Sequence, residues 1–119
     1  MADPALVILY VNDVARSAAF YEALLGAAPA EASPGFAMFP RAGGMGIGLW
    51  ARDGVEPGPG PVGGSELAFA VADVDATHAE WLRRGFVIAL PPTEMDFGRC
   101  CVALDPDGHR LRAFTPAAT

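Results

Sequence analysis

The sequence predicts an α+β fold made of two βαβββ modules, whose curved mixed sheets form a cleft. The first observation is a weak internal repeat, in which Val11 and Asp13 correspond to Val71 and Asp73, 60 positions later. The second is that each half shows an apolar run followed by a helical pattern and further strand signals. A Pro/Gly-rich stretch between the halves is the third. Because one such module cannot bury its apolar face alone, the two halves should share a sheet or a cleft in which a ligand binds.

Length and composition indicate one compact domain of 119 residues built from two repeated modules, at about 5–53 and 65–115. A Pro/Gly linker over 54–64 joins them. The 52% of hydrophobic residues can build a core, and 18% of charged residues is too low for a disordered chain.

The net charge of −6 argues against nucleic acid as a partner, because a phosphate backbone requires a basic face. No apolar run reaches the roughly 18 residues that a membrane span requires. Residues 1–4 lack the basic start and apolar core of a signal peptide. We therefore expect a cytoplasmic protein that binds neither nucleic acid nor membranes.

The first module begins with a continuous apolar run over 6–11, which predicts a buried strand. Asn12 or Asp13 can cap the next helix, because a side-chain oxygen satisfies a free backbone amide. Helical spacing follows over 15–25 and ends at Gly26.

The rest of the first module reads as short strands. The sequence predicts strands over 36–39 and 45–50, joined by a turn at 41–44, with a further strand near 27–32. The linker that follows cannot be helical, and no central strand tolerates so many prolines.

The second module repeats this order. A strand is predicted over 66–71, followed by a helix over 75–84 that Gly85 ends. The next strand, over 86–90, should break at Pro91 and Pro92. Two further strands, over 99–104 and 110–114, flank a turn at 105–108 in which Pro and Gly fix the backbone angles.

The two cysteines, Cys100 and Cys101, are neighbours. Neighbours in a strand point to opposite faces, so they are poor disulfide partners and poor co-ligands of a metal. We expect them to be small buried residues.

Three stretches together resemble the vicinal-oxygen-chelate superfamily, which includes glyoxalase I, extradiol dioxygenases and the bleomycin- and fosfomycin-resistance proteins. They are YVNDVARSAAFYEALLG (10–26), ELAFAVADVDATHAEWLRRG (66–85) and FGRCCVALDPDGHRLRAF (97–114). Within it the sequence is most similar to phenazine-antibiotic resistance proteins, in YVNDVARSAAFY, LWARDGVEP and DFGR…DPDGHRLR. The resemblance implies two βαβββ modules and a homodimer.

The metal enzymes of this superfamily hold their cation with His and Glu at four strand positions. The resemblance carries these positions over to Leu6, Gly48, Glu66 and Arg112. Leucine and glycine offer no side-chain donor and arginine is permanently cationic, so we expect no metal and no cofactor. No other catalytic constellation is evident, and we expect both histidines, His78 and His109, to be solvated.

The face that these positions share is instead suited to a flat apolar ligand. The resemblance places a ligand-stacking tryptophan at Trp50, and strand alternation puts Tyr10 on the same face as Leu6. Gly46 and Gly48 should leave room beside the indole. Phe36, Met38, Met95 and Phe97 could wall the site, or could equally belong to the core, whereas Trp81, which corresponds to Tyr21 in the repeat, should only pack.

The sequence thus predicts a metal-independent protein that sequesters a planar aromatic molecule such as a phenazine-like antibiotic. The expected ligand-binding residues are Trp50, Tyr10, Phe36, Met38, Glu66, Phe97 and Arg112. An alternative is a metal-dependent or metal-free lyase, isomerase or dioxygenase-like enzyme of the same superfamily. A third is a paralogue whose pocket is filled by its own side chains.

The positions of Glu66 and Arg112 converge on one site in the superfamily. A lone charge on a partly desolvated face is costly, so a carboxylate and a guanidinium placed there should form an ion pair.

Overall fold

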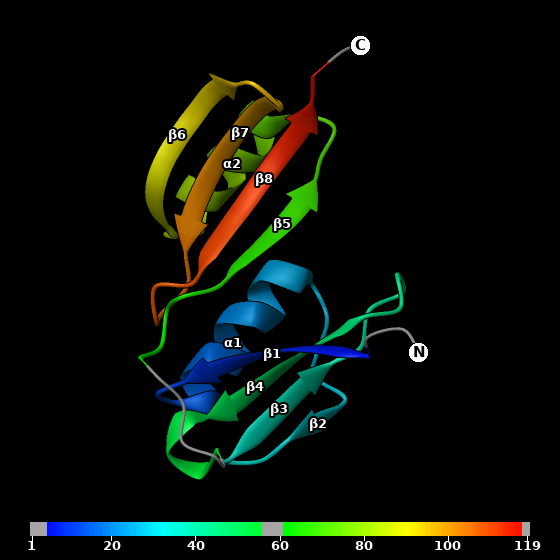
Figure 1. The fold of residues 1–119 in the computed structure, drawn as a ribbon, viewed down its shortest axis with the longest axis vertical. Helices are drawn as coiled ribbons and strands as arrows, with labels where there is room; N and C mark the ends of the chain where they lie inside the picture. The colour runs from blue at the N-terminus through cyan, green and yellow to red at the C-terminus, as the bar shows by residue number, and fades with distance from the viewer. Residues whose placement is uncertain (1–4, 56–60, 118–119) are drawn as a thin grey trace. The chain divides into compact units, whose positions relative to one another are not determined.

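The computed structural model describes residues 5–55 and 61–117, so residues 56–60 of the expected linker lie outside the described residues. The chain divides into two compact units, Met1–Gly63 and Gly64–Thr119, and each contains one βαβββ module (Figure 1). The predicted pair of βαβββ modules is confirmed. No described helix is long and apolar enough to cross a membrane.

The first unit contains a mixed four-stranded sheet in the order β1-β4-β3-β2. Strand β1 runs parallel to β4, and the other pairs are antiparallel. A short 3-10 helix over Arg52–Gly54 follows β4, so Gly54, expected in the linker, is helical. The elements are β1 (Leu6–Val11), α1 (Val14–Leu25), β2 (Glu31–Ala32), β3 (Phe36–Phe39) and β4 (Gly46–Ala51).

Alternation along the strands separates two faces of this sheet. The helix α1 packs on β3 and β4. Leu9, Phe39 and Leu49 are at most 2% exposed and form the core with Tyr21 of α1. The residues between them in each strand lie on the opposite face, which we call the open face of the first unit.

The second unit has the same topology, with sheet order β5-β8-β7-β6 and β5 parallel to β8. The repeat extends to the strand register, because Tyr10 pairs with Trp50 across β1 and β4, and Ala70 pairs with Phe114 across β5 and β8. The elements are β5 (Glu66–Ala70), α2 (Val74–Arg83), β6 (Val87–Met95), β7 (Gly98–Leu104) and β8 (Arg110–Pro116).

The repeated aspartates cap the two helices. The Asp13 carboxylate accepts a hydrogen bond from the Arg16 backbone N–H at 3.1 Å, and Asp73 accepts one from Ala76 at 3.0 Å. Each bond satisfies one of the four amides that a helix start leaves without an intrahelical partner. Of the two residues considered for the first cap, Asp13 is the one that acts.

Several expectations about this fold are wrong in detail. Strand β1, which the sequence predicts to be buried, lies at the sheet edge and exposes Leu6, Ile8 and Tyr10 by 40%, 39% and 37%. Strand β6 continues through Pro91 and Pro92, with register shifts on either side of Leu90. It lies at the sheet edge, where a missing backbone N–H breaks no ladder on the outer side. The strand expected near 27–32 is only Glu31–Ala32. His109 is not solvated but 3% exposed, with its Nδ1 2.6 Å from the Ser65 hydroxyl.

Candidate functional site

The open face of the first unit exposes large apolar side chains. Leu6, Ile8 and Tyr10 of β1 are 40%, 39% and 37% exposed. Their partners on β4 are Gly46, Gly48 and Trp50, in that order, and cross-strand partners share a face. The face is therefore apolar across β1 and β4.

Aromatic side chains cluster at one end of this open face. The rings of Phe36 and Trp50 meet edge to face, with centroids 6.4 Å apart, and Trp50 is half-buried. Tyr10 is the β1 partner of Trp50, and Met38 is the β3 partner of Gly48. The four residues predicted from this module thus lie on one face.

The glycines do not leave the room that the sequence suggested. A Cβ atom added at Gly48 would lie 3.1 Å from Cζ of Phe36 and 3.4 Å from Cγ1 of Ile8. The missing side chain is therefore replaced by the Phe36 ring, which rests above the Gly48 backbone. The space left by the glycine at this position is filled by an aromatic ring of the protein itself.

In the second unit, the face of β5 and β8 that carries Glu66 and Arg112, opposite the buried Leu111 and Ala113, contains the predicted ion pair, and we call it the open face of the second unit. Nε of Arg112 donates to Oε2 of Glu66 at 3.1 Å, and Nη2 donates to Oε1 at 3.2 Å. The Arg112 side chain is 18% exposed and that of Glu66 is 37% exposed. The hydrogen bond to Glu66 is the main reason why the pKa of Arg112 rises above its usual value. The predicted pairing is confirmed.

Further contacts hold Arg112 in place. Its Nη1 donates to Sγ of Cys100 at 3.2 Å, and its guanidinium carbon lies 6.0 Å from the centroid of the Phe97 ring. The Phe97 ring meets that of Phe114 edge to face at 6.4 Å. Sγ of Cys100 lies 3.7 Å from Sδ of Met95. The predicted residues Phe97 and Met95 therefore gather around Arg112.

Two members of this cluster were missed by sequence reasoning. Cys100 is buried, as expected, but its thiol faces Arg112. Phe114 occupies in the second module the register position of Trp50 in the first. Aligning the two modules through their last strands would have found it. Cys101 lies on the opposite face, where burial raises the pKa of its thiol.

The donors at the superfamily's metal positions do not fit a divalent cation. Leu6 and Gly48 provide no ligand atom, and the carboxylate of Glu66 is held by the guanidinium of Arg112. Within residues 5–55 and 61–117, no group of three or more His, Cys, Asp or Glu side chains could hold a metal ion.

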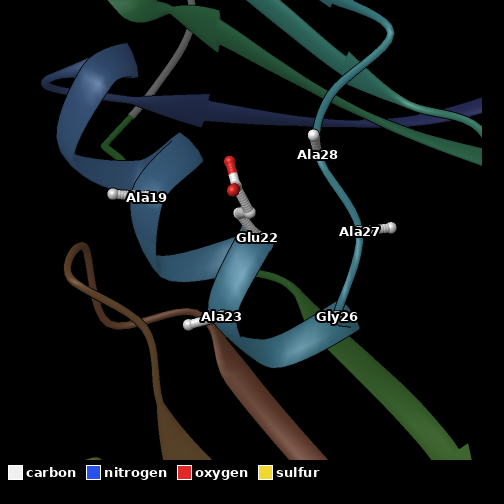
Figure 2. A pocket seen from close by; sticks show the side chains of 6 residues that line it. All are labelled: Ala19, Glu22, Ala23, Gly26, Ala27 and Ala28. Carbon is white, nitrogen blue, oxygen red and sulfur yellow. The ribbon is translucent and has the colours of Figure 1, made fainter.

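A separate hollow of about 510 Å³ lies at the end of α1 in the first unit (Figure 2). It contains none of the predicted site residues and no aromatic ring, and Glu22 supplies its only charged side chain. Such a lining gives a planar ligand nothing to stack on, so the aromatic open face of each unit remains a candidate site. The hollow is lined by Ala19, Glu22, Ala23, Gly26, Ala27 and Ala28.

Removing the charge of Glu66 should destabilise the fold. We expect Glu66→Gln to lower the free energy of unfolding by about 1 kcal/mol, because Arg112 would lose its counter-charge on a partly buried face. Glu80→Gln is the matched control, since Glu80 pairs with Arg83 and Arg84 on the exposed surface of α2. Urea denaturation compares the two. An effect of Glu66→Gln no larger than that of Glu80→Gln would contradict the stabilising role.

The sequence is similar to those of known proteins. Residues 4–113 match the family described as the Glyoxalase/Bleomycin resistance protein/Dioxygenase superfamily. The chain is 33% identical over 116 residues to the phenazine antibiotic resistance protein EhpR of Enterobacter agglomerans, covering 92% of this chain and 88% of that protein.

Solved structures also resemble the chain. A protein of Agrobacterium tumefaciens solved by NMR shares 44% identity with a TM-score of 0.87, over 99% of this chain and 100% of that one. The antibiotic-binding protein TnmS3 of a Streptomyces species has a TM-score of 0.79 at 23% identity, over 98% of each chain. At that identity the likeness concerns the fold alone.

Proposed function

Because the chain belongs to the glyoxalase/bleomycin resistance protein/dioxygenase superfamily, we propose that it is an antibiotic-resistance protein that binds and sequesters a planar aromatic molecule of phenazine type. The relative EhpR, a phenazine antibiotic resistance protein, supports this class of ligand. Sequestration requires burial of the ligand and no chemical step.

The observation that carries the proposal is the aromatic cluster on the open face of the first unit. Trp50 is half-buried beside Phe36, and Tyr10 of the neighbouring strand is 37% exposed. Stacking stabilises each aromatic pair by roughly 0.5–1.5 kcal/mol beyond the burial of apolar surface. A flat polycyclic ligand that stacks on several of these rings would gain this free energy at each one. The open face of the second unit, taken by itself, offers the Phe97 ring and the Glu66–Arg112 pair.

We propose that binding is independent of metal, because the only carboxylate at the four superfamily positions is already engaged by Arg112. Metal analysis of the purified protein separates this from the enzyme alternative. One tightly bound divalent ion per chain would favour a metal-dependent lyase, isomerase or dioxygenase.

Trp50 should be the principal stacking residue. We expect phenazine to quench tryptophan fluorescence, and Trp50→Ala to weaken phenazine binding by more than about 1 kcal/mol, a typical scale for a buried aromatic contact. Calorimetric titration measures the affinity of both forms. Leu82→Ala is the control, because Leu82 is a 54% exposed residue on α2 and belongs to no strand of either open face. Undiminished affinity in Trp50→Ala would refute this role.

We also propose a cytoplasmic homodimer, as the resemblance to the superfamily implies. Sedimentation equilibrium tests the assembly, and a mass of 12.3 kDa at micromolar concentration would identify a monomer instead.

A further inference from the structure

Trp50 has neighbours on every side of the open face of the first unit. Across the sheet, Tyr10 of β1 and Phe36 of β3 are its strand partners. The 3-10 helix follows it along the chain, where a Cβ added at Gly54 would lie 3.7 Å from Nε1 of the indole. The strand neighbour without a side chain is Gly48, two residues earlier on the same face. A ligand that lies beside the indole must therefore stand above Gly48.

The spacing along β4 suits an aromatic ring in this place. Two residues of a strand span about 6.7 Å. Paired aromatic rings have centroids roughly 4.5–7 Å apart. A ligand ring that packs against the Trp50 indole along the strand direction thus comes over the Gly48 backbone.

The Phe36 ring already occupies the place above Gly48. A Cβ added at Gly48 would lie 3.1 Å from Cζ and 3.2 Å from Cε1 of Phe36, which are adjacent atoms at the outer edge of the ring. Cγ1 of Ile8 would lie 3.4 Å away. Gly48 is buried although it lies on the open face, so these side-chain ends close over it. The present occupant of the place is thus the bare edge of an aromatic ring.

Phe36 can leave this place more easily than a core aromatic residue can. It is half-buried, whereas Phe39, on the opposite face of β3, is 1% exposed. The Phe36 side chain turns between staggered rotamers without any movement of the strand. It would give up its edge-to-face contact with Trp50 and its contact with Gly48, and a ligand ring in the same place would restore contacts of the same kind.

The surroundings of this place favour a ring edge without substituents. Within the described strands β1, β3 and β4, no residue of this face is charged, and the first charge appears at Glu31 of β2, the strand partner of Met38. A charged substituent would therefore lose its water without gaining a charged partner. A methyl group would overlap the backbone, because the edge of the Phe36 ring already rests on Gly48.

We propose that Phe36 is a displaceable cover, and that the ligand places a terminal ring without substituents above Gly48 once this cover swings away. The site thereby selects planar polycycles by one bare end, whatever groups the other end carries. The proposal rests on the proposed function for stacking on Trp50, and it adds which part of the ligand lies against the indole. It involves residues of the first unit alone.

A series of three probes tests the selection by calorimetric titration of the full chain at neutral pH. The probes are phenazine, 2,3-dimethylphenazine, which keeps one bare outer ring, and 2,3,7,8-tetramethylphenazine, which keeps none. We expect the dimethyl compound to bind within about threefold of phenazine, and the tetramethyl compound at least about tenfold more weakly, which corresponds to 1.4 kcal/mol. Burial of apolar surface alone predicts the reverse order, because each methyl group adds apolar area.

Variants of Phe36 test the cover. Phe36→Ala should bind phenazine at least about threefold more tightly, because a closed cover lowers the apparent affinity by the fraction of molecules in which it is open. Phe36→Leu should change the affinity in the same direction by less, and it decides the question if Phe36→Ala does not fold. Phe86→Ala is the control, since this half-buried ring packs beside Trp81 and belongs to no strand of either open face. Weaker binding in the Phe36 variants would make the ring a wall of the site and overturn the cover.

Gly48→Ala tests the place itself. The added Cβ should weaken phenazine binding at least about tenfold. The loss should persist when Phe36→Ala is combined with it, because the ligand ring, and not only Phe36, meets the new atom. Gly43→Ala is the matched control, since a Cβ added there meets no atom within 4 Å. Unchanged affinity in Gly48→Ala would show that no ligand ring stands above this residue and would overturn the proposal.

The outcomes separate this proposal from the proposed function. Equal affinities for the three phenazines, with Trp50→Ala still weakening the binding of phenazine, would overturn the selection and leave the proposed function standing. Failure of phenazine to bind to the unmodified chain would overturn both.

Discussion

Gly98→Ala should destabilise the protein by about 3–5 kcal/mol, the sum of a strained backbone and a steric overlap. Gly98 begins β7 with φ at 138°, a conformation that residues with a Cβ rarely adopt. An added Cβ would overlap the carbonyl oxygen of Thr115 and lie 2.8 Å from the backbone nitrogen of Ala117. Thr115 lies near the end of β8 and Ala117 directly follows that strand. The Ala117 N–H donates a hydrogen bond to the Phe97 carbonyl at 2.8 Å, so these atoms cannot easily move aside.

Gly26→Ala provides the matched control for that substitution. Gly26 ends α1 with φ at 71°, but an added Cβ there would meet no atom within 4 Å. Only the backbone strain remains, at about 1–2 kcal/mol. Urea denaturation of both variants measures the difference. Equal losses of stability would show that β8 yields to the extra atom and that the overlap is not important.

Much of the fold could be predicted because the same signals occur twice. The apolar run before Asp13 and the one before Asp73 both became edge strands parallel to the last strand of their module. Both aspartates cap the helix that follows. The two caps are local properties, in which a side chain acts on backbone a few residues away, so spacing alone identifies them.

The errors arise where a distant part of the chain decides the local structure. Pro91 and Pro92 would break a central strand, but their place at the sheet edge depends on which strands pair. The position of His109 after a turn predicts a solvated side chain, yet the hydroxyl of Ser65, the residue before β5, lies 2.6 Å from its Nδ1. No local pattern carries that information.

The candidate site also contains features that could be predicted from the sequence and features that could not. The Glu66–Arg112 pair was predictable because the family resemblance assigns both positions to one site. The Phe36 ring above Gly48 was not, because a glycine in a strand signals a close approach without saying what approaches. If the proposed ligand stacks on Trp50, it must either displace the Phe36 ring or pack against it. Tryptophan fluorescence can follow such binding once the signals of Trp50 and Trp81 are separated.

Trp81 and Tyr21 should contribute similar amounts to the free energy of unfolding, each within its own module. Trp81 is 6% exposed and packs beside Phe86, and Tyr21 is fully buried at the corresponding place on α1. We expect Trp81→Ala and Tyr21→Ala each to lower the free energy of unfolding by about 3–5 kcal/mol, through lost burial and the cavity left behind. Urea denaturation measures both. A loss below about 1 kcal/mol for Trp81→Ala would contradict its role in the core.

Trp81→Phe then links stability to ligand binding. Phenylalanine keeps most of the apolar volume, so this variant should remain folded, and Trp50 becomes its only tryptophan. If Trp81 only packs, phenazine affinity should stay within about twofold of the wild type, less than 0.5 kcal/mol. The fluorescence that remains should be quenched on binding. Loss of the quenching in Trp81→Phe, with affinity unchanged, would place the ligand near Trp81 and remove Trp50 from the site.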